Sequence, residues 1–568
     1  MQKKDNALEK MRHSAAHLVA HAVKELFPKT ILTLGPPTEH GFFYDILPEK
    51  NLKEADISII EKKMHEIAAR NLTLTHEQVP KMQARELYKN NPFKLELIDS
   101  IPGDTVGIAR QGDFYDLCKG GHVENTSQIK HFKLLHLSGS YWRADRDGQA
   151  LQRITGTAFL TAKDMRLWQE RQEEAQKYDH RRLGKELDLF SFHSEGVGFP
   201  FFHAKGTLIL NIMRSHLRKV LKKIGYQEIC TPTMLNDDLW KQSGHYDHYK
   251  KNMYFCEIEK ESYAVKPMNC PGAILLYKER PRSYRELPLR LSEFGMVHRY
   301  ELSGVLHGLF RVRAFTVDDG HIFCTPEQLD QEILTDVKTI LMVLKTFGFE
   351  NVDIKLATKP KEAMGTDQLW DKATNALKNA LETVGCNYTI AEGDGAFYGP
   401  KLEYHIQDSM GRSWQCSTTQ VDFFQPERFD LSYISSSGNK ECPVIIHRAI
   451  YGSFERFFGI LLEHYKGNLP FWLCPIQVKM LTITDEHKPY AQNIANQLSQ
   501  HGLRVIMDKS SDPISGQIKA AQIAKIPWML IIGNKEVEND TIALRTRDGK
   551  QQFGLTIDKL LKISSESQ

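Results

Sequence analysis

Apolar residues recur three and four positions apart from Ala7 to Leu26, with Glu, Lys and Arg between them, and this period predicts an amphipathic helix. Short strand-like runs follow, interrupted by the turn sequences GPP, IPGD and KGG. Together these elements predict a compact α+β domain over residues 1–160.

Residues 161–186 are dense in charged and helix-forming residues, which predicts a linker helix with a solvated charged face. From 187 to 467 strands and helices alternate, and the strand-like segments that carry arginine favour an antiparallel sheet over a doubly wound parallel one. Residues 468–568 continue in βαβα order, which predicts a small α/β domain with a mainly parallel sheet. The fold class that follows is an α+β multidomain protein.

Composition and charge argue against a polycationic nucleic-acid-binding protein, a disulfide-rich secreted protein and a membrane protein. With 568 residues the chain is long enough for several domains, and a net charge of +3 confines any nucleic-acid surface to a local patch. The nine cysteines form no CxxC pair, which argues against a disulfide framework and for a reducing compartment. Because the N-terminus lacks an apolar segment and no later run is long enough to span a bilayer, we expect a soluble, cytoplasmic protein without a membrane partner.

Three distant segments carry metal-binding residue types: Cys270 in KPMNCPG, His321 in TVDDGHIF and His447 in VIIHRAIYGSFERF. One thiolate and two imidazoles are a suitable ligand set for zinc and leave a fourth tetrahedral position open to water or substrate. The residue types therefore predict a catalytic zinc site.

Two strand-like segments on either side of the turn SGVLHG bring together Arg299, Glu301, Arg311, Arg313 and Phe315. The planar guanidinium of arginine binds two phosphate oxygens at once, and an aromatic face can stack on a base. The alternative is a surface hairpin with salt bridges. Further along the chain, Arg456 follows the small residues Gly452 and Ser453 at the start of a predicted helix, a suitable position for binding a terminal phosphate.

The first block contains a second cluster of metal-binding residue types. His13 and His17, in HSAAH, lie one helical turn apart on one face. Cys118 and His122, in CKGGH, are separated by glycines that predict a loop. From the residues alone two interpretations are open. The four residues form a structural zinc site, or His13 and His17 are two partly buried histidines on an amphipathic helix.

The sequences KPMNCPG, EFGMVHRYELSGVLHGLFRVRAFT, GAFYGPKLE, WQCSTTQVDF and HRAIYGSFERFFGIL together resemble the motifs of threonyl-tRNA synthetases, which are class II aminoacyl-tRNA synthetases. The resemblance runs from the first predicted helix nearly to the C-terminus. It implies ATP-dependent activation of L-threonine, transfer to the 3′ end of tRNA(Thr), and hydrolytic editing of mischarged Ser-tRNA(Thr). It also implies a class II antiparallel catalytic core, a Zn²⁺ on Cys270, His321 and His447, Mg²⁺ with ATP, and a homodimer through residues 225–232, which resemble motif 1.

The resemblance also implies residue roles in activation. Arg299 would hold the α-phosphate and the amino-acid carboxylate, Arg456 the γ-phosphate, Asp319 the threonine hydroxyl, and Tyr398 would lie near the amino group. The other ATP contacts implied are Glu301 at the adenine amine, Phe315 stacked on the adenine, Arg311, Gln415 and Ser453.

By the same resemblance the first block is the editing domain, residues 187–467 are the class II catalytic domain, and residues 468–568 bind the anticodon through Glu536 and Arg545. The editing residues implied are His13, His17, Cys118, His122 and Asp116, with Lys94 as a further candidate, acting without a metal.

Physical chemistry gives a reason for two sites. Valine is nearly isosteric with threonine, and an apolar pocket separates such a pair by only about 10²-fold, whereas a metal that requires a hydroxyl oxygen rejects valine. Serine has that hydroxyl and lacks one methyl group, which is worth roughly 1–3 kcal/mol. Activation alone therefore admits serine, and a second, hydrolytic site is predicted.

The chain departs from the family pattern in several places, among them residues 510–519, SSDPISGQIK, where the family has a basic stretch. The family usually begins with a TGS domain, which we expect this chain to lack; Val317 stands where the family usually has Gln, and Ala273 where it has His. Two other functions therefore stay open: a synthetase-like RNA-binding regulator without ligase activity, and a stand-alone hydrolase of mischarged tRNA. Neither accounts for the presence of Arg299, Arg456 and all three zinc-ligand types.

Overall fold

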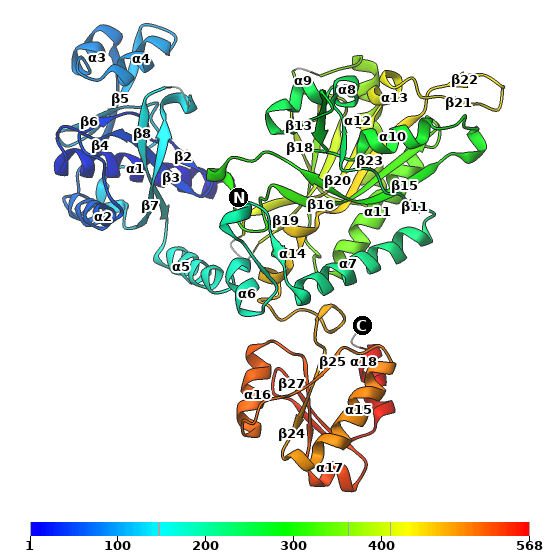
Figure 1. Ribbon diagram of the computed structural model, residues 1–568. Coiled ribbons are helices and arrows are strands. Elements are labelled where there is room, and N and C mark those ends of the chain that lie inside the picture. The colour runs from blue at the N-terminus through cyan, green and yellow to red at the C-terminus, as the bar shows by residue number, and fades with distance from the viewer. Residues whose placement is uncertain (1, 146–147, 362, 409–410, 567–568) are drawn as a thin grey trace. The chain divides into compact units, whose positions relative to one another are not determined.

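The computed structural model describes residues 2–145, 148–361, 363–408 and 411–566 (Figure 1). The chain divides into two compact units, Met1–Glu173 and Glu174–Gln568. Helix α5 (Ala162–Lys177) contains the division, and a second helix, α6 (His180–Glu186), begins after Asp179, whose side chain caps it. The prediction of one linker helix was therefore wrong, because a cap residue divides the segment. The predicted domain boundaries stay predictions.

The first unit is built on an antiparallel sheet with the order β1-β3-β8-β7, to which β2 adds at β3. Its strands are β1 (Ile31–Leu32), β2 (Pro37–Thr38), β3 (Gly41–Leu47), β7 (His131–Tyr141) and β8 (Ala150–Phe159). Helices α1 (Gln2–Leu26) and α2 (Glu54–Ala69) pack against it and share its hydrophobic core. The predicted first helix is confirmed and begins earlier than its apolar period, at Gln2.

A smaller antiparallel sheet in the same unit has the order β4-β5-β6. Its strands are β4 (Leu74–Pro80), β5 (Thr105–Gln111) and β6 (Phe114–Leu117), and the helices α3 (Lys81–Leu87) and α4 (Pro92–Ser100) lie between β4 and β5 in the chain. The residues after β6 form a loop in which Gly120 and Gly121 have positive φ angles of 93° and 88°, so the predicted loop at CKGGH is confirmed.

The second unit contains an eight-stranded sheet with the order β11-β15-β16-β23-β20-β19-β17-β18. Its strands are β11 (Gln227–Glu228), β15 (Leu289–His298), β16 (Ala314–Cys324), β17 (Asp353–Ala357), β18 (Tyr388–Ala391), β19 (Lys401–Gln407), β20 (Ser413–Asp422) and β23 (Val444–Ser453). The pairs from β15 to β17 are antiparallel, and only the short edge strands β11 and β18 pair in parallel. The predicted antiparallel core is confirmed.

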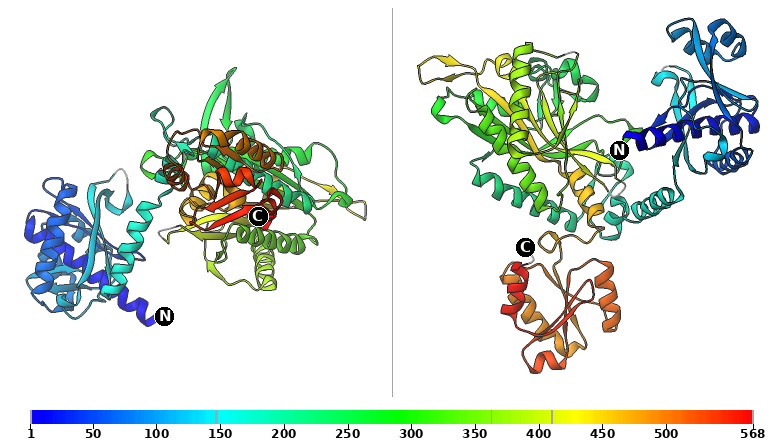
Figure 2. Two further views of the ribbon diagram at one scale, coloured as in Figure 1. Left: turned by 90° about the horizontal axis from the view of Figure 1, so that it is seen from below. Right: turned by 180° about the vertical axis from the view of Figure 1, so that it is seen from behind.

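Alternation along the central strands gives this sheet two different faces. Ile322 and Ile446 belong to a core shared with α7 (Ala204–Lys223), α11 (Leu329–Thr346), α12 (Asp367–Val384) and α14 (Phe454–His464). Their neighbours His321 and His447 therefore face the other side of the sheet. Phe323 and Ile445 face that side too, and they pack with residues of α10 (Cys270–Lys278). Figure 2 shows the sheet from two further sides.

Residues 474 onward form a five-stranded sheet with the order β25-β24-β26-β27-β28. Its elements are β24 (Val478–Thr482), α15 (Lys488–Gln500), β25 (Val505–Met507), α16 (Ile514–Ile523), β26 (Trp528–Ile532), α17 (Asn534–Glu538), β27 (Ile542–Thr546), β28 (Gln551–Leu555) and α18 (Ile557–Glu566). Helices α15 and α18 cover one face and α16 the other (Figure 1). The first three strands are parallel as predicted, but β27 and β28 are antiparallel, so the sheet is mixed.

Across the described ranges, no helix is both long and apolar enough to cross a membrane.

Candidate functional site

The core sheet and the start of α10 bring the three predicted metal ligands together. His321 and His447 are direct cross-strand partners on β16 and β23, with ring centroids 5.0 Å apart. Cys270 is the first residue of α10, and one ligand atom from each of the three lies within 4.8 Å of the others. All three side chains are buried.

The free ring nitrogens fit a metal. His447 Nε2 lies 2.9 Å from Asp422 Oδ2, a fully buried carboxylate, which leaves Nδ1 as the other ring nitrogen. That Nδ1 and His321 Nε2 are both buried, and neither makes a hydrogen bond with the residues that the structure describes; Asp319 Oδ1 lies 3.8 Å from His321 Nε2. Buried polar atoms without partners are costly, whereas a histidine with one nitrogen on a carboxylate and the other free is the arrangement of a metal ligand. The donor set and its surroundings therefore suit Zn²⁺.

Two further predicted residues lie beside this ligand set. Asp319 shares a face of β16 with His321, and one of its oxygens accepts a hydrogen bond from Asn269 Nδ2 at 3.1 Å. Burial raises the pKa of the Asp319 carboxyl. Tyr398 donates to Gln420 Oε1 at 3.0 Å, and its ring lies 5.6 Å from that of His447. The ligand set is thus bordered by groups that can bind an amine and a hydroxyl.

The predicted nucleotide-binding residues cluster around the hairpin that follows β15. The Arg299 guanidinium lies 5.1 Å from the centre of the Phe315 ring. Glu301 Oε2 accepts from Arg311 Nε at 3.1 Å, so one salt bridge of the alternative interpretation is present. An exposed pair of this kind is weak. Arg313 donates to the backbone oxygens of Glu301 and Val197 and to Ser303 Oγ, so it holds the hairpin together. Among the described residues, Arg299 donates a hydrogen bond only from Nε, to the Pro267 oxygen, and keeps its terminal nitrogens for a ligand.

Arg456 is held from two sides at the first turn of α14. Its Nε donates to the backbone oxygen of Phe310 at 3.0 Å and its Nη1 to that of Gln415 at 2.9 Å, and its backbone N–H donates to Ser453 Oγ. Burial lowers the pKa of Arg456, and the charges of Arg299 and Arg311 act in the same direction. Three converging cations with this mutual repulsion form a site for a polyanion such as a triphosphate.

The first unit brings the four predicted editing residues together at the N-terminal half of α1. Cys118 Sγ lies 3.0 Å from His122 Nε2 and 3.4 Å from His13 Nε2. The rings of His13 and His17 lie 4.4 Å and 4.7 Å from that of His122. The cluster is compact, and its members come from α1 and from the loop after β6.

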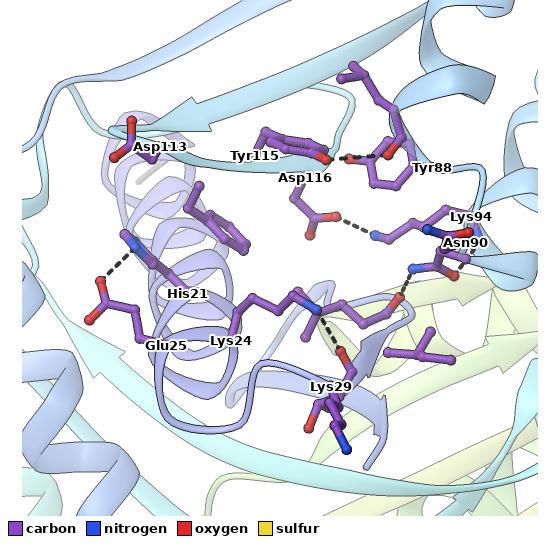
Figure 3. A pocket seen from close by; sticks show the side chains of 16 residues that line it. His21, Lys24, Glu25, Lys29, Tyr88, Asn90, Lys94, Asp113, Tyr115 and Asp116 are labelled. Atoms are coloured by element: carbon purple, nitrogen blue, oxygen red, sulfur yellow. Dashed lines mark hydrogen bonds and ion pairs between the residues drawn. The ribbon is translucent and has the colours of Figure 1, made fainter. Parts of the chain in front are cut away.

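Asp116 connects this cluster to a cavity of about 760 Å³ on its other side, which Figure 3 shows. Its Oδ1 lies 2.5 Å from Lys94 Nζ, and its Oδ2 accepts from Tyr44 at 2.5 Å and lies 3.4 Å from His17 Nδ1. Lys94 and Asp116 are each only 2% exposed. A buried carboxylate of this kind depends on its cation, because either charge alone would be costly.

Burial sets the protonation states of the cluster. It lowers the pKa of His122 to about 2, lowers the pKa values of His13 and His17, and raises the pKa of the Cys118 thiol to about 11. At neutral pH the cluster therefore consists of neutral imidazoles and a protonated thiol. Such groups can orient and polarise a water molecule.

The remaining predicted residues lie apart from these clusters. Glu536 is on α17, where its carboxylate accepts from the Gly533 backbone N–H at 3.0 Å. Arg545 is on β27, and its Nε is buried without a partner. Within the described ranges no hydrogen bond or ion pair joins the two. The motif 1-like segment 225–232 contributes the edge strand β11, which pairs with β15.

Sequence reasoning missed several partners of the predicted residues, namely Asp422, Asn269, Gln420, Tyr44 and Ser14. Asn269 and Asp422 lie inside the quoted motifs KPMNCPG and WQCSTTQVDF, which was the available signal. Tyr44 reaches Asp116 from 72 positions away, and nothing in its own segment indicates the contact.

Comparison with known protein families gives three matches. The class II core domain of tRNA synthetases (G, H, P, S and T) matches residues 254–465. An anticodon binding domain matches residues 473–566. The second additional domain of threonyl and alanyl tRNA synthetases matches residues 106–155.

Whole proteins match as well. The chain is 49% identical over 540 residues to the threonine–tRNA ligase of Clostridium tetani, covering 94% of this chain and 84% of that protein. It is 50% identical over 539 residues to that of Acetivibrio thermocellus, covering 94% and 85%. Among solved structures, the RNA binding domain of threonyl-tRNA synthetase from Cryptosporidium parvum matches with a TM-score of 0.66 and 41% identity, covering 68% of this chain and 98% of that one.

Proposed function

Because the chain belongs to the threonyl-tRNA synthetase family, we propose that it is a threonine–tRNA ligase. It activates L-threonine with ATP, transfers it to the 3′ end of tRNA(Thr), and hydrolyses mischarged Ser-tRNA(Thr). The single observation that carries this proposal is the co-occurrence in one chain of a Cys/His set with free ligand atoms and a cluster of converging arginines. A regulator without ligase activity has no need of either.

In activation the protein acts mainly by positioning charge. The threonine carboxylate attacks the α-phosphorus of ATP, and this step needs alignment and electrostatic stabilisation more than acid–base groups. Arg299 holds the α-phosphate and the carboxylate, and Arg456 holds the γ-phosphate that leaves with pyrophosphate, together with the Mg²⁺ that accompanies ATP. Phe315 stacks on the adenine and Glu301 accepts its amine, with Arg311, Gln415 and Ser453 as further contacts.

Cys270, His321 and His447 would hold Zn²⁺. The ion would supply a Lewis acid that binds the amino and hydroxyl groups of threonine. Asp319 accepts the hydroxyl proton in a hydrogen bond, and Tyr398 borders the amino group. Valine offers no oxygen to this arrangement, and serine does.

Editing is assigned to the first unit, with residues 1–160 as its domain. The neutral rings of His13, His17 and His122 orient a water molecule against the seryl ester, and Cys118 fixes the ring of His122 through its sulfur. The pair of Lys94 and Asp116 supplies charge at the edge of the cluster. We propose that this site acts without a metal.

Further proposals follow from the family. Residues 187–467 form the catalytic domain and residues 468–568 the anticodon-binding domain, with Glu536 and Arg545 reading the anticodon. Residues 225–232 build a homodimer interface, which agrees with the exposure of both residues of the edge strand β11 and of Cys230, which follows the strand. All nine cysteines are free, as in a reducing cytoplasm.

ATP–pyrophosphate exchange with threonine, serine and valine tests the proposal, before and after removal of zinc. We expect exchange with threonine, weaker exchange with serine, none with valine, and loss of all exchange without zinc. The absence of exchange with every amino acid in the zinc-loaded protein would instead favour the regulator or the stand-alone hydrolase.

A further inference from the structure

A buried histidine outside the proposed sites, His180, lies between two elements of the ATP site. It is the first residue of α6 and is fully buried. Its Nδ1 donates to Glu463 Oε1 at 2.8 Å, and its Nε2 accepts from the backbone N–H of Leu309 at 3.0 Å. Glu463 belongs to α14, which also carries Arg456, and Leu309 belongs to the turn between β15 and β16. One imidazole therefore connects the helix to the turn.

The grouping of Asp179, His180 and Glu463 is geometrically capable of holding a metal ion. Both ring nitrogens of His180, however, already have protein partners, and the neutral ring needs one donor and one acceptor, which it has. The ring is thus a connecting element with a fixed tautomer.

The turn is shaped around this ring. A Cβ at Gly308 would lie 2.2 Å from His180 Nε2, so only glycine allows the approach. The Phe310 ring packs against the His180 ring at 4.1 Å between centroids, with the two planes tilted by 32°, and Phe310 is 1% exposed. His180 therefore fixes both the backbone and the side chain of residues 308–310.

The next link reaches the proposed phosphate clamp directly. The backbone oxygen of Phe310 is one of the two carbonyls that hold the Arg456 guanidinium, at 3.0 Å. A shift of the turn moves this acceptor, and the guanidinium then keeps only the Gln415 oxygen. The two carbonyl anchors hold the Arg456 guanidinium in place against the like charges of Arg299 and Arg311.

We propose that His180 is a positioning residue for ATP: it pins the turn at residues 308–310 so that the Phe310 carbonyl holds Arg456 in place for the terminal phosphate. His180 touches no substrate and acts through Leu309 and Phe310. The inference rests on the proposed function only for the identity of the nucleotide.

Two amide substitutions separate the two bonds of the ring. In His180→Asn the amide reaches the position of Nδ1, so the contact with Glu463 is retained and the acceptor for Leu309 is lost. In His180→Gln the amide oxygen reaches the position of Nε2 and can accept from Leu309. His487→Asn is the matched control, since His487 is also buried and bonded through both nitrogens, to Thr484 and Asn534, in the C-terminal region.

The measurements are the Kd of Mg·ATP by calorimetry, the KM values for ATP and threonine in exchange, and the melting temperature of each variant. We expect His180→Asn to weaken ATP about tenfold, the value of one buried hydrogen bond, with an unchanged KM for threonine. His180→Gln should stay within about threefold of the unmodified protein, and His487→Asn should match it.

Equal ATP affinities in His180→Asn and His180→Gln, or a parallel rise in both KM values, would overturn the positioning role and leave a structural one. The Kd measurement requires no amino acid. If the unmodified protein binds ATP but shows no threonine-dependent exchange, the proposed ligase function fails while the role of His180 is still decided by ATP affinity.

Discussion

Asp422→Asn tests the proposed zinc site without touching a ligand. Asp422 Oδ1 accepts the backbone N–H groups of Phe424 and Gln425 at 2.8 and 2.9 Å, and Oδ2 faces His447 Nε2 at 2.9 Å. Asparagine keeps one oxygen for the two backbone groups and places an NH₂ group against His447. The ring can then no longer donate from Nε2, so the tautomer with a proton on Nδ1, the ligand atom, is favoured.

The loss of such a carboxylate partner typically costs 10–100-fold in metal affinity, which corresponds to about 1.4–2.7 kcal/mol. Competition with a chromophoric chelator at pH 7 measures the zinc affinity, and elemental analysis measures the zinc that remains after dialysis. Exchange with threonine should fall in parallel and recover with added zinc. The melting temperature of the zinc-free protein should change little, because the backbone bonds of Asp422 are retained.

Asp336→Asn is the control, since Asp336 is 4% exposed and its carboxylate accepts from Thr419 at 2.6 Å on the opposite face of the sheet. Burial raises the pKa of Asp336 to about 6, and asparagine keeps an oxygen that can accept from Thr419. Equal zinc affinity in Asp422→Asn and the unmodified protein, or an equal loss in Asp336→Asn, would refute the assignment of His447 Nδ1 as a ligand atom.

Three other substitutions probe the remaining sites. Arg456→Ala should raise the KM for ATP about 100-fold, because a charge-assisted phosphate contact is lost, with little change in the KM for threonine; exchange at varied ATP and threonine measures both, and equal rises would contradict the assignment. Lys94→Ala leaves the Asp116 carboxylate buried without its cation, so the free energy of unfolding of the first unit, measured in urea, should fall by about 3–5 kcal/mol. Deacylation of Ser-tRNA should fall at least about 100-fold, and normal deacylation would exclude the pair from editing. The folded-state pKa of His122, about 2, lies below its ordinary value of 6.5, so the unfolded chain binds more protons between these two pH values. The stability that this histidine contributes above pH 6.5 is therefore lost as the pH falls, by up to about 1.4 kcal/mol per pH unit. Urea unfolding from pH 7.5 to 5 should show a shallower loss in His122→Asn, and identical slopes would be inconsistent with a depressed pKa.

Residue types indicated which side chains could form the proposed zinc site, but not the geometry that brings them together. A strand-like segment was expected directly after the turn SGVLHG, whereas β16 begins only at Ala314 and extends to Cys324. Residues 307–311 form a tight turn instead, held by two backbone hydrogen bonds between His307 and Arg311. That turn depends on the buried ring of His180, about 130 positions earlier, and local pattern carries no information about such a contact. The register that places His321 opposite His447 likewise follows from the folded sheet.

The C-terminal region shows a different limit. The apolar runs at VKMLTIT and WMLIIG predicted buried parallel strands correctly. The edge strand β28 (Gln551–Leu555) has four exposed residues of five, so its sequence lacks the apolar alternation by which a strand is recognised. Its hydrogen bonds with β27, rather than buried side chains, define it as a strand.

Two clusters of cysteine and histidine occur in this chain, and their surroundings suit them to different chemistry. In the core, His321 Nε2 and His447 Nδ1 are buried and make no hydrogen bond with the described residues, and Asp422 orients the His447 ring. In the first unit, Cys118 Sγ is already in contact with His13, His122 and the backbone N–H of Gly120, and burial raises the pKa of its thiol to about 11. A metal at either cluster would have to displace a thiol proton, because burial raises the pKa of Cys270 as well as that of Cys118. At the first cluster it would also have to displace the contacts of the Cys118 sulfur with His13, His122 and Gly120. The same donor types therefore suit two proposed roles. The core cluster suits a metal that selects a substrate with a hydroxyl group, and the cluster in the first unit suits neutral groups that orient water for ester hydrolysis.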